Sequence, residues 1–113
     1  VKVNRYISFS SREKHTEKSE VFKIVQDADR LDAIGAIGIA RAFNYGGFRN
    51  NAIYLPEEKS DGRSKSTIGH FHEKLLKLNG MMNTSTGRRI GDKRHKILER
   101  FLEQFYEEWN FKK

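Results

Sequence analysis

Apolar residues recur at helical spacing along most of the chain. In the first such stretch they stand three or four positions apart, in the order Val21, Ile24, Ala28, Leu31 and Ile34. This spacing predicts one face of an α-helix. Thr16 or Ser19 is a suitable N-terminal cap for that helix.

The most apolar segment follows, and its small residues are unusual. Residues 34–43 continue the helical pattern with Gly35 and Gly38 inside it. Each glycine costs a helix about 1 kcal/mol relative to alanine, so we expect close packing against another helix to compensate. The sequence of residues 44–47, Asn-Tyr-Gly-Gly, then predicts the end of the helix.

A long polar connection separates this helix from the next one. Residues 48–66 carry the only proline and have the composition of a mobile surface loop. Ser66 or Thr67 is a suitable cap for the second helix, which Asn79-Gly80 ends or bends. The apolar side of this helix comprises Ile68, Phe71, Leu75 and Leu78.

The last helix is predicted to follow residues 84–86 and to run towards Asn110. Its apolar face is broad. An i, i+4 stripe is widened by neighbouring residues, and together they are Ile97, Phe101, Phe105, Trp109, Leu98, Leu102 and Tyr106. Only residues 1–9 hint at the alternation of a strand. The sequence therefore predicts an all-α fold, a helical bundle.

Length and composition limit the class of protein. The chain has 113 residues and no cysteine. This length indicates one domain, and the lack of cysteine excludes disulfides, thiolate metal sites and cysteine nucleophiles. No apolar run approaches the roughly 20 residues of a membrane-spanning helix, and the first residues have no signal-peptide pattern. We therefore expect a cytoplasmic protein without a membrane partner.

The chain is basic, with 22 Lys+Arg against 15 Asp+Glu and a formal charge of +7. Such a charge favours anionic ligands such as nucleotides or other phosphates, although scattered basic residues also fit a solvated surface. A nucleic-acid binder would need basic residues interleaved with exposed aromatic ones. The aromatic residues of the last helix stand at core spacing instead, which disfavours nucleic acid as a partner.

Candidate metal ligands are few. His70 and His72 stand two positions apart on a predicted helix, so they do not form an i, i+4 metal pair. His15 and His95 stand among charged residues. None of the four histidines has the spacing of a metal motif.

An acidic cluster precedes the most apolar segment. It contains Asp27, Asp29 and Asp32, of which the last two share a helix face. These carboxylates could pair with Arg30 or Arg41, or they could supply oxygen ligands to a magnesium or manganese ion. One carboxylate alone makes no metal site.

The segment Val25–Arg41 reads VQDADRLDAIGAIGIAR. It resembles the later conserved block of HD-domain metal-dependent phosphohydrolases, especially those of the small single-domain bacterial branch. The resemblance covers essentially the whole chain. Its further matches follow in order at residues 7–9, 45–47, 65–76, 82–84 and 101–109.

The resemblance implies an all-helical fold and a divalent metal, manganese or magnesium. The family holds this metal through one histidine, an adjacent His-Asp pair and a final aspartate, and the final aspartate corresponds to Asp29. Asp27, Arg30 and Asp32 would lie beside the metal site. The metal would polarise a phosphoryl oxygen and lower the pKa of the attacking water, in substrates that are nucleotides or other phosphate compounds.

The resemblance also implies residues that bind the substrate. Lys65, His70 and Lys74 follow the long loop where family members have similar residues, and they are candidate ligands of the substrate phosphate. Lys74 fits a solvated helix position equally well.

One departure from the family is large. No His-Asp dipeptide occurs in the sequence, so three of the four expected metal ligands are absent, and a second copy of the chain lacks them too. We therefore expect a partial domain, the C-terminal portion of an HD-type domain without its N-terminal His and His-Asp segment. Alone, it is expected to be inactive and need not hold a metal.

The alternative is a non-catalytic, truncated HD-like domain that acts as an interaction or regulatory module. The small-residue face at Gly35 and Gly38 calls for a closely packed partner helix, and the aromatic face of the last helix calls for further cover. Left uncovered, these faces favour self-association. We therefore predict a homo-oligomer.

Overall fold

The computed structural model describes residues 15–58 and 65–111. Within these two ranges it contains four α-helices, one 3₁₀-helix and no strand, which confirms the predicted all-α fold. The elements are α2 (His15–Leu31), α3 (Gly35–Phe48), α4 (Thr67–Glu73), the 3₁₀-helix η2 (Leu75–Met81) and α5 (Ser85–Trp109). The hint of a strand at residues 1–9 lies outside the described residues.

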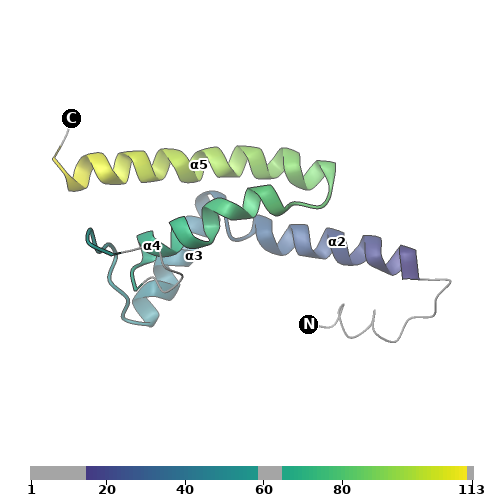
Figure 1. Ribbon diagram of the computed structural model, residues 1–113, viewed down its shortest axis with the longest axis horizontal. Helices are drawn as coiled ribbons and strands as arrows, with labels where there is room; N and C mark the ends of the chain where they lie inside the picture. Colours follow the sequence, from purple (N-terminus) through teal and green to yellow (C-terminus); the bar gives the residue numbers. More distant parts are fainter. Residues whose placement is uncertain (1–14, 59–64, 112–113) are drawn as a thin grey trace.

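Helix α5 is the element against which the others are arranged (Figure 1). It contacts α2, α3 and η2, while α4 contacts α3 and η2. Helices α2 and α3 follow one another along α5, so that α2 lies near the start of α5 and α3 lies further along it (Figure 1). No helix in the described ranges is long and apolar enough to cross a membrane.

The core is small and lies between α5 and the α4–η2 segment. All four residues of the predicted apolar side of the second helix are buried there, as the spacing predicted. The buried apolar residues are Ile34, Ile68, Phe71, Leu75, Leu78, Met82, Leu98 and Leu102. Aromatic rings surround this core, with the Phe71 and Phe101 centroids 5.8 Å apart.

The buried face of α5 is centred on other residues than the predicted i, i+4 stripe. Leu98 and Leu102 are buried, whereas Ile97 and Trp109 are 41% and 46% exposed. The reason is that η2, α2 and α3 all approach the Leu98 side of α5. The predicted start holds, because the Thr84 hydroxyl caps the helix by accepting from the Gly87 N–H at 2.9 Å.

The first half of α2 does not bury the face that its spacing predicted. Val21 and Ile24 are 51% and 58% exposed. Asp27 of α2 contacts Asn83 and Thr84, which immediately precede α5. The turns of α2 before Asp27 therefore extend past the start of α5, and no described element covers them.

The two early glycines act differently from the prediction. Gly35 does not lie inside a continuous helix: α2 ends at Leu31, and Gly35 begins α3 with φ +76°, a conformation that favours glycine. A Cβ on Gly38 would collide with the backbone carbonyl of Ala33. Gly38 therefore allows the α2–α3 connection, and not a partner helix, to approach closely.

Two helix ends also differ from the sequence pattern. Helix α3 continues through the predicted stop and ends at Phe48. Helix α4 ends at Glu73, where Lys74 leaves the helical conformation with φ −131°, and η2 continues to Met81. The change of direction thus comes before the predicted Asn79-Gly80 position. The predicted cap is confirmed, since the Ser66 hydroxyl accepts from the Gly69 N–H at 2.9 Å.

The connection after α3 is anchored in its described part, contrary to the prediction of a mobile loop. The Tyr54 ring packs edge-on against Phe105, Tyr106 and Trp109, with centroid distances of 5.5, 5.5 and 5.1 Å. The backbone carbonyl of Ala52 accepts from the Thr67 N–H at 2.9 Å. Residues 52–54 therefore bridge the start of α4 and the end of α5.

Asp27 joins α2 to the start of α5. Its Oδ1 accepts from the Asn83 N–H at 2.7 Å, and its Oδ2 accepts from the N–H and the hydroxyl of Thr84 at 2.8 and 2.6 Å. The residue is 3% exposed. Burial alone would raise the pKa of Asp27, but the hydrogen bonds from Asn83 and Thr84 outweigh it and hold the pKa below its ordinary value.

We predict that Asp27→Asn lowers the free energy of unfolding by about 1–3 kcal/mol, because an amide cannot accept all three hydrogen bonds. Urea titration at neutral pH measures the loss. Asp32→Asn, an exposed position after the same helix, is the matched control and should change stability by less than about 0.5 kcal/mol.

The native chain and Asp27→Asn together also test how the stabilisation by Asp27 depends on pH. Because the folded-state pKa of Asp27 is lowered, its contribution is complete above the ordinary pKa of 3.8 and is lost as the pH falls through the folded-state value. The difference between the native chain and Asp27→Asn should therefore shrink below about pH 4. A difference that stays constant down to pH 2 would contradict the role given to the carboxylate.

We predict opposite effects for alanine at two glycines of α3. Gly38→Ala should destabilise the chain by about 1–3 kcal/mol, since the new methyl group meets backbone atoms of Ala33 that cannot move aside. Gly47→Ala has open space around its Cβ and should stabilise by up to about 1 kcal/mol. Thermal unfolding of both variants measures the contrast, and equal effects would refute the packing argument.

Candidate functional site

A groove lies between α3 and the start of α4. It consists of two adjoining cavities of about 90 and 240 Å³, which share Ala42, Tyr45 and His70. The smaller cavity is completed by Gly46, Asn51, Ser66 and Thr67. The larger one is completed by Ala33, Gly38, Arg41 and Leu75.

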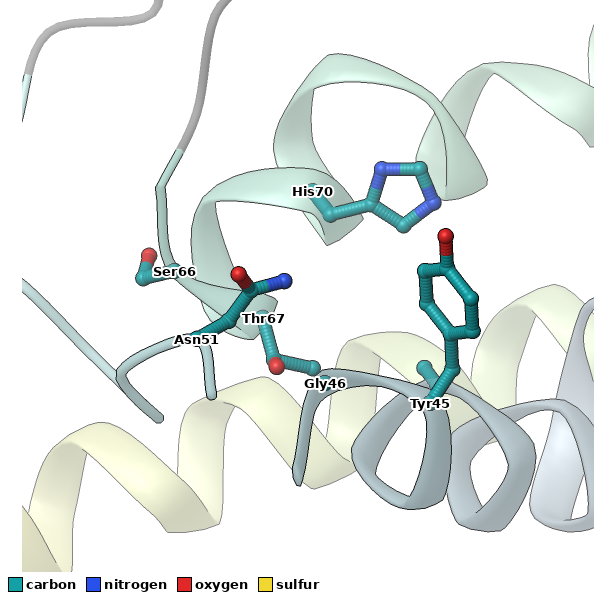
Figure 2. Close-up of a pocket in the computed structure, with 7 residues that line it drawn as sticks. Tyr45, Gly46, Asn51, Ser66, Thr67 and His70 are labelled. Carbon is teal, nitrogen blue, oxygen red and sulfur yellow. The ribbon is translucent and has the colours of Figure 1, made fainter. Parts of the chain in front are cut away.

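Three polar side chains from different elements converge on this groove. Figure 2 shows Tyr45 of α3 with its phenolic oxygen directed towards the His70 ring of α4, and the Asn51 amide directed into the space beside them. Within the described part of the chain, no side-chain hydrogen bond involves any of these three groups. Their donors and acceptors are therefore available to a ligand.

Local packing explains why the elements meet here. Gly46 lies directly under Thr67, and a Cβ at Gly46 would collide with the Thr67 hydroxyl oxygen. The Asn51 N–H donates to the Gly46 carbonyl at 2.8 Å, which turns the chain back after α3. The Ser66 hydroxyl, besides capping α4, donates to Glu58 at 2.6 Å. The groove is thus built on one glycine and one helix cap.

His70 is the predicted substrate residue that lines the groove. Partial burial and the neighbouring Lys74 charge lower the pKa of His70 from its ordinary value of 6.5, and Glu73 opposes them only in part. The imidazole is therefore mainly neutral at pH 7, with one donor and one acceptor nitrogen. Its tautomer is free to adapt to a ligand.

The other two predicted substrate residues lie beside the groove and do not line it. Lys65 and Lys74 are both exposed. The Lys65 backbone N–H donates to Glu58, and the Lys74 charge acts on His70. Their role as phosphate ligands stays a prediction.

Asp29, the predicted metal ligand, is exposed on the last turns of α2. No ion pair joins it to an arginine in the described ranges. Arg30 instead donates to the Met81 carbonyl at 2.6 Å, and Arg41 donates to the Asp32 carbonyl at 3.2 Å. The Asp29 carboxylate is therefore open to solvent.

The described residues do not fit a complete metal site. Among residues 15–58 and 65–111, no group of three or more His, Cys, Asp or Glu side chains could hold a metal ion. Asp27 is already occupied by Asn83 and Thr84. His72 lies 2.7 Å from the Tyr106 hydroxyl. The described part of the chain therefore offers no set of three or more ligands around Asp29.

Sequence reasoning missed several groove residues. Arg41 and Tyr45 belong to the segments that resemble the HD-domain family, and Asn51 to the predicted loop, but no sequence pattern assigns any of the three to a ligand. No local pattern identifies them, because they meet only through the close approach of Gly46 to Thr67.

Comparison with known proteins relates the chain to a group of bacterial proteins. No protein-family model matches it. The chain is 48% identical over 82 residues to the uncharacterized protein YpgQ of Bacillus subtilis. This alignment covers 73% of this chain and 37% of YpgQ.

Solved structures extend this relation to the fold. An HD-superfamily hydrolase of Bacillus thuringiensis matches with a TM-score of 0.71 and 50% identity, over 78% of this chain and 45% of that one. Bacillus subtilis YpgQ in complex with ADP matches with a TM-score of 0.68 and 34% identity, over 94% and 61%. The chain thus spans between about a third and two thirds of the length of these relatives. The described helices have an HD-like fold.

Proposed function

We propose that this chain forms part of an HD-superfamily phosphohydrolase that acts on nucleotides or other phosphate esters. The observation that carries the proposal is the match to the HD-superfamily hydrolase of Bacillus thuringiensis, at 50% identity over 78% of the chain. The relation to YpgQ, which has been crystallised with ADP, supports a nucleotide as substrate. The basic charge of +7 favours such an anionic ligand.

The proposal gives Asp29 the role of one ligand of a divalent metal, manganese or magnesium. Two features support this role: the carboxylate is exposed, and no described arginine pairs with it. Because the described residues contain no group of three or more candidate ligands, a complete metal site needs ligands from outside them. When bound, such a metal supplies Lewis-acid activation of the phosphoryl group and of water.

The residues around Asp29 have supporting roles in this proposal. Arg30 holds the η2 end through the Met81 carbonyl, and Asp27 holds the start of α5. Both contacts fix the last turns of α2, on which Asp29 lies. Asp32 stands three residues later, and its backbone is held by Arg41. These contacts would keep the Asp29 carboxylate in one place.

Activity is best tested in a hybrid protein. We would replace the matching segment of the Bacillus thuringiensis hydrolase with this chain and measure phosphate or pyrophosphate release from nucleotides, with manganese or magnesium. The hybrid should hydrolyse nucleotides only with metal, and Asp29→Asn should lower the rate at least about 100-fold. Glu20→Gln, an exposed change on the same helix, is the control and should leave the rate unchanged.

The possible outcomes test the role of Asp29 and the proposed hydrolysis separately. A folded, active hybrid that tolerates Asp29→Asn would refute the metal-ligand assignment. A folded hybrid without metal-dependent hydrolysis, while the unaltered Bacillus thuringiensis protein is active under the same conditions, would refute the proposed function.

A second candidate function is a non-catalytic interaction module that associates with itself. Exposed apolar side chains on α2 and α3 favour it, since large exposed apolar patches mark interaction surfaces. Ile24 is 58% exposed, Ile37 is 66% exposed and Phe48 is 81% exposed. Self-association alone does not separate the two candidates, because an oligomer can also be an enzyme; the hybrid assay for hydrolysis separates them.

We expect the isolated 113-residue chain to sediment as a dimer or a larger species at micromolar concentration. Ile37→Lys should weaken the association roughly 10- to 100-fold, since burial of one large aliphatic side chain is lost. Glu20→Lys, a polar exposed position, should have little effect. A monomer at all concentrations in sedimentation velocity would exclude the self-associating module.

A further inference from the structure

We infer that the groove between α3 and α4 binds a nucleotide in one direction, with its phosphate at the Arg41 end and its nucleoside at the Asn51 end. The inference deepens the proposed function and rests on it for the class of ligand. It adds an orientation and assigns Asn51 as a residue that recognises the uncharged part of the ligand.

The orientation follows from the unequal charge of the two cavities. Of the two cavities of the groove, the larger is lined by Arg41 and the smaller by Asn51, Ser66 and Thr67. The larger cavity therefore carries a permanent cation at its edge, and the smaller cavity is lined by uncharged polar groups. An arginine attracts phosphate strongly. Amide and hydroxyl groups suit the hydrogen-bonding edge of a base or a ribose.

The position of Arg41 relates this end of the groove to Asp29. One nitrogen of Arg41 donates to the Asp32 carbonyl at 3.2 Å, so the guanidinium reaches the end of the acidic segment that begins with Asp27. A phosphate bound at this end would lie beside the Arg41 guanidinium that contacts Asp32, three residues after the carboxylate that we propose as metal ligand. The reverse orientation would place an uncharged nucleoside there.

The residues shared by both cavities suit the middle of the ligand. Tyr45 and His70 line both cavities and face one another across the groove (Figure 2). The Tyr45 ring is 59% exposed, so its face can stack on a planar base or cover a ribose. Arg49 lies over the same ring at 6.0 Å from its centroid, which helps to hold the ring in place.

The Asn51 amide gives the nucleoside end its selectivity. The backbone of Asn51 is fixed by its hydrogen bond to the Gly46 carbonyl. Its side chain makes no hydrogen bond within the described residues and points into the groove (Figure 2). An amide offers a donor and an acceptor side by side, which matches the paired groups on a base edge. The fully ionised phosphate groups of a nucleotide only accept hydrogen bonds and would use half of this capacity.

Binding to the 113-residue chain tests the inference without metal and without catalysis. Isotope-labelled chain would be titrated with ADP, with adenosine and with inorganic phosphate, and the affinity and the shifted resonances would be read by NMR. ADP should shift both ends of the groove, phosphate mainly the Arg41 end, and adenosine mainly the Asn51 end.

Variants separate the two ends. Arg41→Gln should weaken the binding of both ADP and phosphate about tenfold or more. Arg41→Lys should restore part of the phosphate affinity. Asn51→Ala should weaken the binding of ADP and adenosine roughly 2- to 10-fold while leaving the affinity for phosphate unchanged. Asn44→Ala, an exposed asparagine of α3 that does not line the groove, is the matched control and should change neither.

Each failure has its own meaning. If ADP does not bind, if it shifts resonances away from the groove, or if Asn51→Ala weakens phosphate as much as ADP, the inference is wrong. An inactive hybrid protein with intact, oriented ADP binding would instead refute the proposed hydrolysis and leave the oriented groove in place.

Discussion

The three hydrogen bonds that Asp27 accepts hold the described structure together at its centre. They join the last turns of α2 to the first residue before α5, two segments that are more than fifty positions apart in sequence. The carboxylate also fixes Thr84, whose hydroxyl caps α5. Because α5 is the helix that α2, α3 and η2 all contact, the position of one buried carboxylate determines how the other elements lie against it.

The consequence of this joint is a structure with a small core and large exposed apolar areas. Eight apolar side chains are buried around α5 and the α4–η2 segment. Ile24 on α2 and Ile37 and Phe48 on α3 are largely exposed to solvent within the described structure. The same residues that fill a helical face in the sequence therefore form a surface available to another molecule.

The groove depends on a second constraint, the close approach of α3 and α4 at Gly46 and Thr67. This approach brings Tyr45 and His70 to opposite walls and lets the returning chain present Asn51 beside them (Figure 2). Tyr54 holds the same returning segment against the end of α5. A ligand in the groove would thus contact three elements whose relative positions are fixed by packing outside it.

The sequence by itself determined the helices, because their signals are local. Spacing identified the buried face of the α4–η2 segment, and the caps Ser66 and Thr84 act where their residue types predicted. The resemblance of residues 25–41 to HD-domain proteins agrees with the HD-like fold. Only the tertiary structure decided which face of α5 is buried, that Gly38 faces the Ala33 backbone, and that Asp27 acts as a joint. Only it brought Arg41, Tyr45, Asn51 and His70 to one groove. The physical reason is that these contacts join residues on different elements, whose meeting depends on packing and not on any local repeat.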